Sequence, residues 1–142
     1  MLDLFIDGIA AIATPDTLAL MILGVIVGII FGSVPGLTAV TGIALFLPVT
    51  YSLGPIKGMA LLMAIYIGAV SGGLIAAILI NIPGTPASVA TCFDGTPLAR
   101  KGQAYKALGV GTVFSFLGTI FGILILVFVS PIIANFALKF GP

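Results

Sequence analysis

The sequence predicts an all-α integral membrane protein, and its composition and the length of its apolar segments carry this prediction. Of the 142 residues, 61% are hydrophobic and only 6% are charged, whereas about a quarter of the residues in a soluble domain carry charge. The mean hydropathy is +1.38. The apolar segments are long enough to cross a bilayer and are apolar on every side, unlike the helices of a globular core. Pro-Gly pairs interrupt two of these segments, which predicts transmembrane helices with two interrupted half-helix (re-entrant) segments.

Charge and residue usage exclude several classes of function. A net charge of +1 provides no basic surface for a nucleic-acid backbone, so we expect no nucleic-acid partner. The sequence lacks histidine, and its four carboxylates are scattered, so no metal cluster or catalytic triad can be assembled. The single cysteine, Cys92, cannot form an intrachain disulfide and suits a small apolar packing role. We therefore expect no enzyme activity, no metal site and no cofactor other than a transported ion.

Residues 1–17 are predicted to form a separate N-terminal interfacial segment. Apolar residues such as Leu2, Phe5, Ile6 and Ile9 follow helical spacing, with acidic residues on another face, which suits a short helix at the membrane surface. A frayed terminus is the alternative. The segment lacks the positive charges that begin a secretory signal, so we expect it to be retained. Thr14 and Pro15 then predict the start of the next helix.

Residues 18–142 are interpreted as a second, transmembrane region. We predict membrane spans over residues 18–34, 59–80 and 108–133, the last being either one tilted span or a broken one. Residues 35–48 form a helical segment too short to cross the membrane alone, and residues 51–58 a turn. Glycines recur at spacings of four in the first two spans, which predicts closely packed helices. Clustered basic residues at Arg100, Lys101 and Lys106 place their connector on the cytoplasmic side.

Two segments share a pattern that marks a candidate site. G-S-V-P-G-L-T-A-V-T-G begins at Gly32, and N-I-P-G-T-P-A-S-V-A-T begins at Asn81. In each, a Pro-Gly pair interrupts a membrane helix and a short helix resumes. Breaks of this kind persist where they are buried in protein or line a watery cavity, because unpaired backbone groups are costly against lipid. Paired breaks are also the best sequence indication of a transport site.

The resumed helices supply groups that can bind an anion. A helix start exposes backbone N–H groups and a partial positive charge, and threonine, serine and asparagine side chains add hydrogen bonds. Carbonyl groups released at the same breaks can coordinate Na⁺. The predicted substrate-binding residues are Pro35, Gly36, Leu37, Thr38, Thr41, Asn81, Pro83, Gly84, Thr85, Ala87 and Ser88.

Asp94 lies in the stretch C-F-D-G-T-P, where Asp-Gly and proline indicate a turn. One interpretation makes Asp94 an interfacial cap. The other makes Asp94, with Thr91, a candidate for coupling to an ion, because ionisable residues at membrane depth are usually functional. Arg100 and Lys101 are interpreted as topology signals rather than ligands.

The same residues resemble a known family. The stretches from Gly32 to Pro48 and from Tyr66 to Gly102, above all N-I-P-G-T-P and D-G-T-P-L-A-R-K-G, are similar to the large membrane subunit of the tripartite tricarboxylate transporters, the TctA type. The resemblance implies that residues 18–142 form the first part of a larger, multi-pass permease of the bacterial inner (cytoplasmic) membrane. It also implies a small membrane subunit and a periplasmic substrate-binding protein as partners, besides the lipid bilayer and the remainder of the permease. Its activity would be uptake of citrate-like or other organic carboxylates, driven by a Na⁺ or H⁺ gradient.

Other functional classes remain open from the sequence. A non-transporting assembly or scaffold subunit would use the glycines only for helix association. The two polar breaks favour a transporter, because a scaffold does not require them. A channel would need a ring-forming filter or charged pore motif, and the sequence contains neither.

Overall fold

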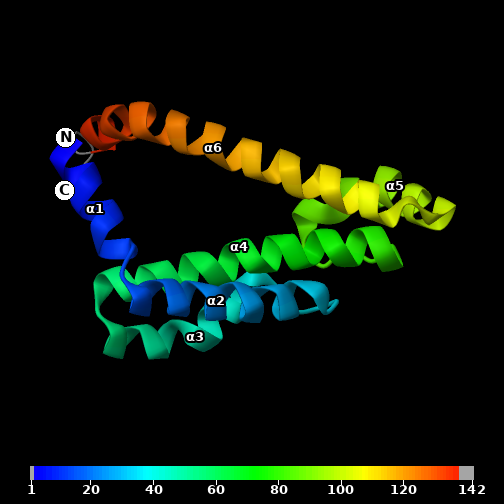
Figure 1. Cartoon of the computed structure of the whole chain (residues 1–142), viewed down its shortest axis with the longest axis horizontal. Helices are drawn as coiled ribbons and strands as arrows, with labels where there is room; N and C mark the ends of the chain where they lie inside the picture. Colours follow the sequence, from blue (N-terminus) through cyan, green and yellow to red (C-terminus); the bar gives the residue numbers. More distant parts are fainter. Residues whose placement is uncertain (1, 138–142) are drawn as a thin grey trace. The chain divides into compact units, whose positions relative to one another are not determined.

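The computed structural model describes residues 2–137 of the chain, and every regular element among them is helical, which confirms the predicted all-α class. Two compact units divide at Leu108 and Gly109, and each is treated separately below. The α-helices labelled in Figure 1 are α1 (Leu2–Ile12), α2 (Pro15–Ser33), α3 (Ala39–Leu53), α4 (Pro55–Ile80), α5 (Val89–Leu98) and α6 (Ala104–Ala137). A 3-10 turn η1 (Pro86–Ser88) precedes α5, and a π-helical stretch η2 (Ala99–Gln103) follows it.

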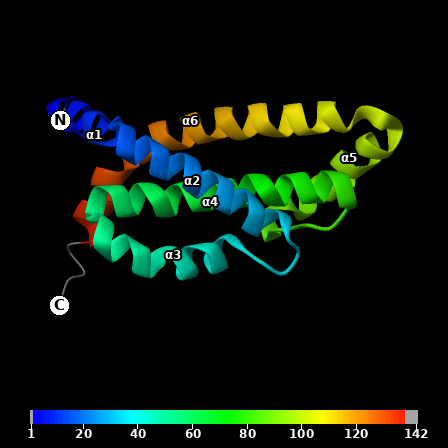
Figure 2. The same cartoon turned by 60° about the horizontal axis from the view of Figure 1, so that its bottom comes forward.

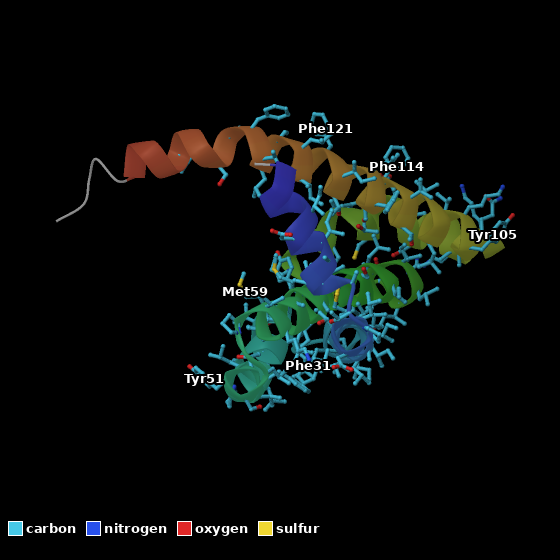
Figure 3. The ribbon with its side chains drawn as sticks, turned by 60° about the vertical axis from the view of Figure 1, so that its left-hand side comes forward. Phe31, Tyr51, Met59, Tyr105, Phe114 and Phe121 are labelled. Carbon is cyan, nitrogen blue, oxygen red and sulfur yellow. The ribbon has the colours of Figure 1, made fainter. Side chains whose placement is uncertain are left out.

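Three helical segments are long and apolar enough to cross a membrane: Pro15–Ser33, Pro55–Ile80 and the apolar part of Pro86–Ser130. These segments confirm the three predicted spans and a multi-pass membrane protein. The third span is unbroken, because α6 is one helix from Ala104 to Ala137 despite its glycines. Its side chains Phe114 and Phe121, seven residues apart, project from the same side of the helix in Figure 3.

Helices α2 and α4 form the closely packed centre of the first unit. A Cβ atom added to Gly28 would meet the carbonyl oxygen of Ile65, and one added to Gly32 would meet that of Ala69. The glycines of α4 pack equally closely against α2, since a Cβ on Gly72 would meet the carbonyl oxygen of Ile29. The predicted close packing is therefore confirmed, and only glycine allows the two backbones to approach this far.

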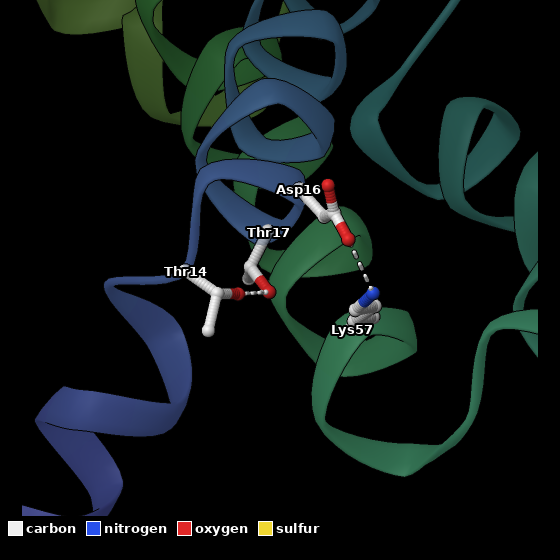
Figure 4. A network of polar contacts seen from close by, with 4 residues as sticks. All are labelled: Thr14, Asp16, Thr17 and Lys57. Atoms are coloured by element: carbon white, nitrogen blue, oxygen red, sulfur yellow. Dashed lines mark hydrogen bonds and ion pairs between the residues drawn. The ribbon is translucent and has the colours of Figure 1, made fainter.

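The paired residue numbers show that α2 and α4 run parallel. At their N-terminal ends, the Asp16 carboxylate and the Lys57 ammonium group are 3.3 Å apart, and the Thr14 and Thr17 hydroxyl oxygens are 2.7 Å apart (Figure 4). Thr14 is the N-cap residue of α2 as predicted, but its side chain bonds to Thr17 rather than to the helix backbone. Because the Asp16–Lys57 pair is exposed, it contributes little stability, on the order of 1 kcal/mol or less. Its value is to show that α2 and α4 start at the same level.

Helix α3 runs antiparallel to α4 and contacts both long helices of this unit. A Cβ on Gly42 would lie 3.0 Å from the side chain of Ile65 and 3.5 Å from the ring of Phe31, while one on Gly58 would lie 3.0 Å from Thr50. Figure 2 shows α3 running alongside α4 toward the end where α4 begins. The chain therefore ascends along α2, returns along α3 and ascends again along α4.

The boundaries of the middle segments differ from the prediction. Helix α3 continues through Pro48 to Leu53, and α4 begins at Pro55, so the turn predicted over residues 51–58 reduces to Gly54, whose φ is 78°. A proline inside a helix removes one intrahelical hydrogen bond, and membrane helices tolerate that loss where neighbouring groups compensate. Pro55 starts the next helix because its ring already has a helical φ and needs no N–H partner at the first position.

The N-terminal segment is a helix, α1, rather than a frayed end. Ile6, Ile9 and Ile12 are exposed on it, while the side chains of Leu2 and Phe5 lie outside those that the structure describes. An exposed apolar face suits the membrane surface. That location, and the division of the chain into 1–17 and 18–142, stay predictions, and residues 138–142 lie outside the described range.

Candidate functional site

The first break separates α2 from α3 and is built around Gly36. Helix α2 ends at Ser33, Val34 is extended, and Gly36 has a φ of 93°. This left-handed conformation strains other residues, so glycine is required here for its backbone freedom. The Leu37 N–H donates to the carbonyl oxygen of Val34 at 3.1 Å. Pro35 and Gly36 are exposed, and Leu37 is half-buried.

Thr38 caps the resumed helix α3. The Thr41 N–H donates to the Thr38 hydroxyl at 3.4 Å, and the two hydroxyl oxygens lie 3.2 Å apart. Such a cap satisfies one of the unpaired N–H groups of the first helical turn. Thr38 is half-buried and Thr41 is exposed, so both hydroxyls remain within reach of a ligand.

The second break follows α4, where Asn81 takes a left-handed conformation with a φ of 58°. After Pro83 and Gly84, a new helix starts at Pro86 with Thr85 as its N-cap, which confirms that a helix resumes after this break. The Ser88 hydroxyl accepts the Thr85 N–H at 3.2 Å and lies 2.7 Å from the Thr85 carbonyl oxygen, to which it donates. Thr85 and Ser88 are 7% and 4% exposed, so these bonds hold the break from within.

The two breaks meet at the C-terminal end of α2. A Cβ on Gly84 would collide with the carbonyl oxygen of Gly32 and lie 2.9 Å from the Cα of Gly73. Gly32 occupies the last turn of α2, directly before the first break. The second break therefore packs against the backbone that leads into the first, although 48 positions separate Gly36 from Gly84.

The helices that resume after the two breaks run away from each other along α4, so their N-terminal ends face each other. A Cβ on Gly73 would lie 2.8 Å from the Thr85 hydroxyl, and one on Gly95 would lie 2.8 Å from Ile78, so η1 and α5 run parallel to α4. Helix α3 runs the opposite way. Thr38 precedes Gly42 by four residues, so at about 1.5 Å of rise per residue it lies about 6 Å from the level of Ile65, toward the C-terminal end of α4. Thr85 lies at the level of Gly73. The two helix starts are therefore about 6 Å apart along the axis of α4.

Part of the predicted donor set is already engaged within the protein. The Leu37 N–H bonds to Val34, and the Ser88 N–H bonds to the Thr85 carbonyl oxygen at 3.0 Å. Of the N–H groups predicted to face an anion, those of Thr38 and Ala87 therefore remain the better candidates. Ala87 is exposed, as are Asn81 and Pro83.

The predicted turn at Asp94 is wrong, because α5 continues through Asp94, Gly95 and Pro97 to Leu98. Gly95 is pressed against Ile78 within the helix, and the chain instead turns at Gly102, where φ is 76°. Asp94 is therefore exposed on the body of α5 rather than at a cap, and Thr91 is half-buried one turn earlier. Their role in ion coupling stays a prediction.

An open groove of about 400 Å³ lies beside the second break. Asn81 and Pro83 form one wall, and one face of α5 and its continuation forms the other, through Val89, Cys92, Phe93, Thr96, Pro97 and Arg100. The buried Thr96 hydroxyl lies 2.8 Å from the carbonyl oxygen of Ala77 and 3.0 Å from the amide oxygen of Asn81. The sequence interpretation did not include Thr96 and gave Arg100 only a topological role. Thr96 and Arg100 are four residues apart, and this spacing, which places both side chains on one helical face, could have indicated from the sequence that they line the same surface.

Comparison with known proteins places this architecture in a family. Residues 18–142 match the model described as "Tripartite tricarboxylate transporter TctA family". A curated protein of Agrobacterium vitis, described as a 52.8 kDa protein in the TAR-I ttuC' 3'region, is 38% identical over 144 residues, covering 99% of this chain. The chain spans about 29% of that relative's length. No solved structure matches the chain. On the family match and this relative, the chain belongs to the TctA family of tripartite tricarboxylate transporters.

Proposed function

We propose that this chain forms part of the path by which a secondary transporter takes up organic carboxylates, and that the two breaks hold the substrate. The observation that carries the proposal is the meeting of the breaks, where Gly84 packs on Gly32 and two helix starts oppose each other along α4. The acid is citrate-like or a related carboxylate, and uptake is driven by a cation gradient. A periplasmic binding protein, a small membrane subunit and the remainder of the permease complete the system in the bacterial inner membrane.

Electrostatics support a carboxylate between the two helix starts. The start of α3 offers the Thr38 N–H and the start of η1 offers the Ala87 N–H, and a helix start carries a partial positive charge of about half an elementary charge. Two starts directed at one region add their fields, and low-dielectric surroundings strengthen the attraction. The hydroxyl groups of Thr38 and Thr41 border one start, and Ala87 provides an exposed backbone position at the other. Hydrogen bonds from these groups orient the acid without a buried cation.

The coupling ion is proposed to be Na⁺ or H⁺. Backbone carbonyl groups freed where α2 and α4 end are hard oxygen ligands of the kind that Na⁺ accepts at discontinuous helices. Asp94 and Thr91, one turn apart on α5, are the candidates for a proton or for an additional ion ligand. Imposing Na⁺ and pH gradients separately distinguishes the two ions.

A scaffold function is the second candidate, and one observation favours it. The backbone contacts between α2 and α4 explain the glycine repeats without any ligand. A scaffold does not explain why Thr38, Thr85 and Ser88 organise helix starts beside interrupted backbone, so transport accounts for more of the molecule.

Uptake by vesicles tests the proposal. Vesicles containing the complete permease, its small subunit and its binding protein would be supplied with labelled citrate and a panel of other carboxylates. We expect accumulation that follows either the Na⁺ or the pH gradient. Failure to accumulate any acid under either gradient, with folded protein in the vesicles, would favour the scaffold.

A further inference from the structure

The groove beside the second break is lined by apolar side chains toward one end and by a guanidinium group at the other. Val89, Cys92, Phe93 and Thr96 recur at spacings of three and four, so one continuous face of α5 lines it. Arg100 extends the same face by one more turn. Apolar and aromatic side chains thus cover the wall near the start of α5, and the guanidinium group lies at the other end.

Asn81 stands on the opposite wall, and its orientation is fixed from two directions. Its left-handed backbone ends α4, with a φ of 58°, and its amide oxygen lies 3.0 Å from the buried Thr96 hydroxyl. The Thr96 hydroxyl has a single proton, which the Ala77 carbonyl oxygen of α4 and the Asn81 amide oxygen share. The amide NH₂ group of Asn81 takes no part in this contact, so its donors can face the groove.

We propose that this groove is a second carboxylate site of the permease, in which Arg100 binds the carboxylate and Asn81 adds a hydrogen bond. The inference rests on the proposed transport function and assigns Arg100 a binding role that the topology signal alone does not require. Guanidinium matches a carboxylate with two parallel hydrogen bonds, which are stronger than neutral ones. A site at the Arg100 end of the break holds the acid as it enters or leaves the interrupted region.

The groove also indicates the shape of its ligand. A volume of about 400 Å³ lies within the usual range of small-molecule sites, about 300–1,000 Å³. Phe93, Val89 and Pro83 provide apolar contact, and a single guanidinium neutralises one carboxylate. The groove therefore fits an organic anion that presents one carboxylate to Arg100 and a carbon skeleton to the aromatic wall.

Lys101 provides a matched control, because it carries the same charge one residue later but is not among the groove-lining residues of the described chain. Both side chains are exposed, so replacing either one by glutamine has the same effect on the charge of the connector. A role in membrane topology predicts similar consequences for Arg100→Gln and Lys101→Gln. A binding role predicts that only Arg100→Gln weakens the interaction with the acid.

Cys92 permits a binding measurement that does not depend on transport. It lines the groove, is half-buried and is the single cysteine of the chain. The complete permease, with any other cysteines replaced, would be treated with a neutral maleimide in the presence and absence of an acid that the vesicle assay shows to be carried, citrate being the first probe. We expect the acid to slow labelling of Cys92 severalfold in the parent protein and in Lys101→Gln, but not in Arg100→Gln.

Uptake kinetics provide the second readout. Because hydrogen bonds to charged groups are strong, Arg100→Gln should raise the half-saturation concentration of the acid about tenfold or more, with Arg100→Lys intermediate and Lys101→Gln unchanged. Unprotected Cys92 in the parent protein, or equal protection and half-saturation in Arg100→Gln, would overturn this site while leaving carboxylate uptake intact. Absence of uptake in the parent protein would instead overturn the proposed function on which the site depends.

Discussion

Gly36 and Gly84 follow prolines in matching sequence windows, yet they are needed for different physical reasons. Gly36 has a φ of 93° and open space around the position of a Cβ atom. Gly84 lies outside the left-handed region, and a Cβ there would collide with the carbonyl oxygen of Gly32. The first glycine is required for backbone conformation, and the second for close approach of two chain segments.

The difference predicts opposite responses to asparagine. Asparagine tolerates the left-handed conformation, so Gly36→Asn should retain folding and Gly36→Ala should cost about 1–2 kcal/mol. Gly84→Ala and Gly84→Asn should both be strongly destabilising, because the Gly32 backbone cannot yield cheaply. Thermal unfolding of the detergent-solubilised permease measures the effects, with Gly8→Ala as a control in open space. Equal tolerance of Gly84→Ala and Gly8→Ala would contradict the contact between the breaks.

Ser88 and Thr41 separate structural from ligand-facing hydroxyl groups. Ser88→Ala removes a buried acceptor of the Thr85 N–H and should cost about 1–3 kcal/mol of stability. Thr41 is exposed, so Thr41→Ala should leave stability nearly unchanged while weakening uptake of the acid if its hydroxyl contacts substrate. Unfolding temperature and half-saturation concentration, measured on the same preparations, test the separation. Loss of stability in Thr41→Ala with normal uptake would reverse the assignment.

At the scale of elements, the parallel direction of α2 and α4 determines the topology. Both helices start at the Asp16–Lys57 level, so the chain must return across the membrane between them. Helix α3 has 15 residues, or about 22 Å at the usual rise per residue. This length is shorter than the hydrocarbon thickness of about 30 Å, and the first break, in which the Leu37 N–H bonds to the Val34 carbonyl oxygen, connects it to the end of α2. The first break and α3 together make the return, because α4 starts at the level where α2 starts.

This topology predicts that Ser52 and Gln103 lie on opposite sides of the membrane. Ser52 follows the return along α3, and Gln103 precedes α6 after the second ascent. In intact cells, Ser52→Cys should react with an impermeant thiol reagent from the periplasm and Gln103→Cys only after the cytoplasmic side is opened, given the basic connector. Labelling of both from the same side would refute the parallel arrangement. Periplasmic labelling of Gln103→Cys alone would reverse the orientation.

The sequence predicted the long helices well because their signals are local. Apolar length identifies α2, α4 and α6, and the spacing of Gly24, Gly28 and Gly32 correctly indicates a packed face. Boundaries at Pro48 and Asp94 were wrong because turn-forming residue types do not break a helix that tertiary contacts support. Gly95, for example, fits α5 because it packs on Ile78. Local patterns also could not reveal that Gly84 contacts Gly32, since that contact depends on the parallel pairing of α2 with α4.

At the scale of the whole molecule, the chain spans about 29% of the length of its curated relative, and the most apolar stretch of its third span has no buried residue. Apolar helices in this condition need lipid or further helices around them. The closely packed α2–α4 pair, by contrast, is complete within the chain and provides the rigid support on which both breaks are held. Rigid support is what a binding site requires to keep donors in place.

We propose that an organic carboxylate binds between the helix starts of α3 and η1. An experimental structure of the complete permease with a transported acid bound would test this directly. We expect density for the acid between Thr38 and Ala87, with the helices interrupted at Pro35 and Pro83 and Gly84 packed against Gly32. Density far from both breaks, or helices continuous through Pro35 and Pro83, would contradict it.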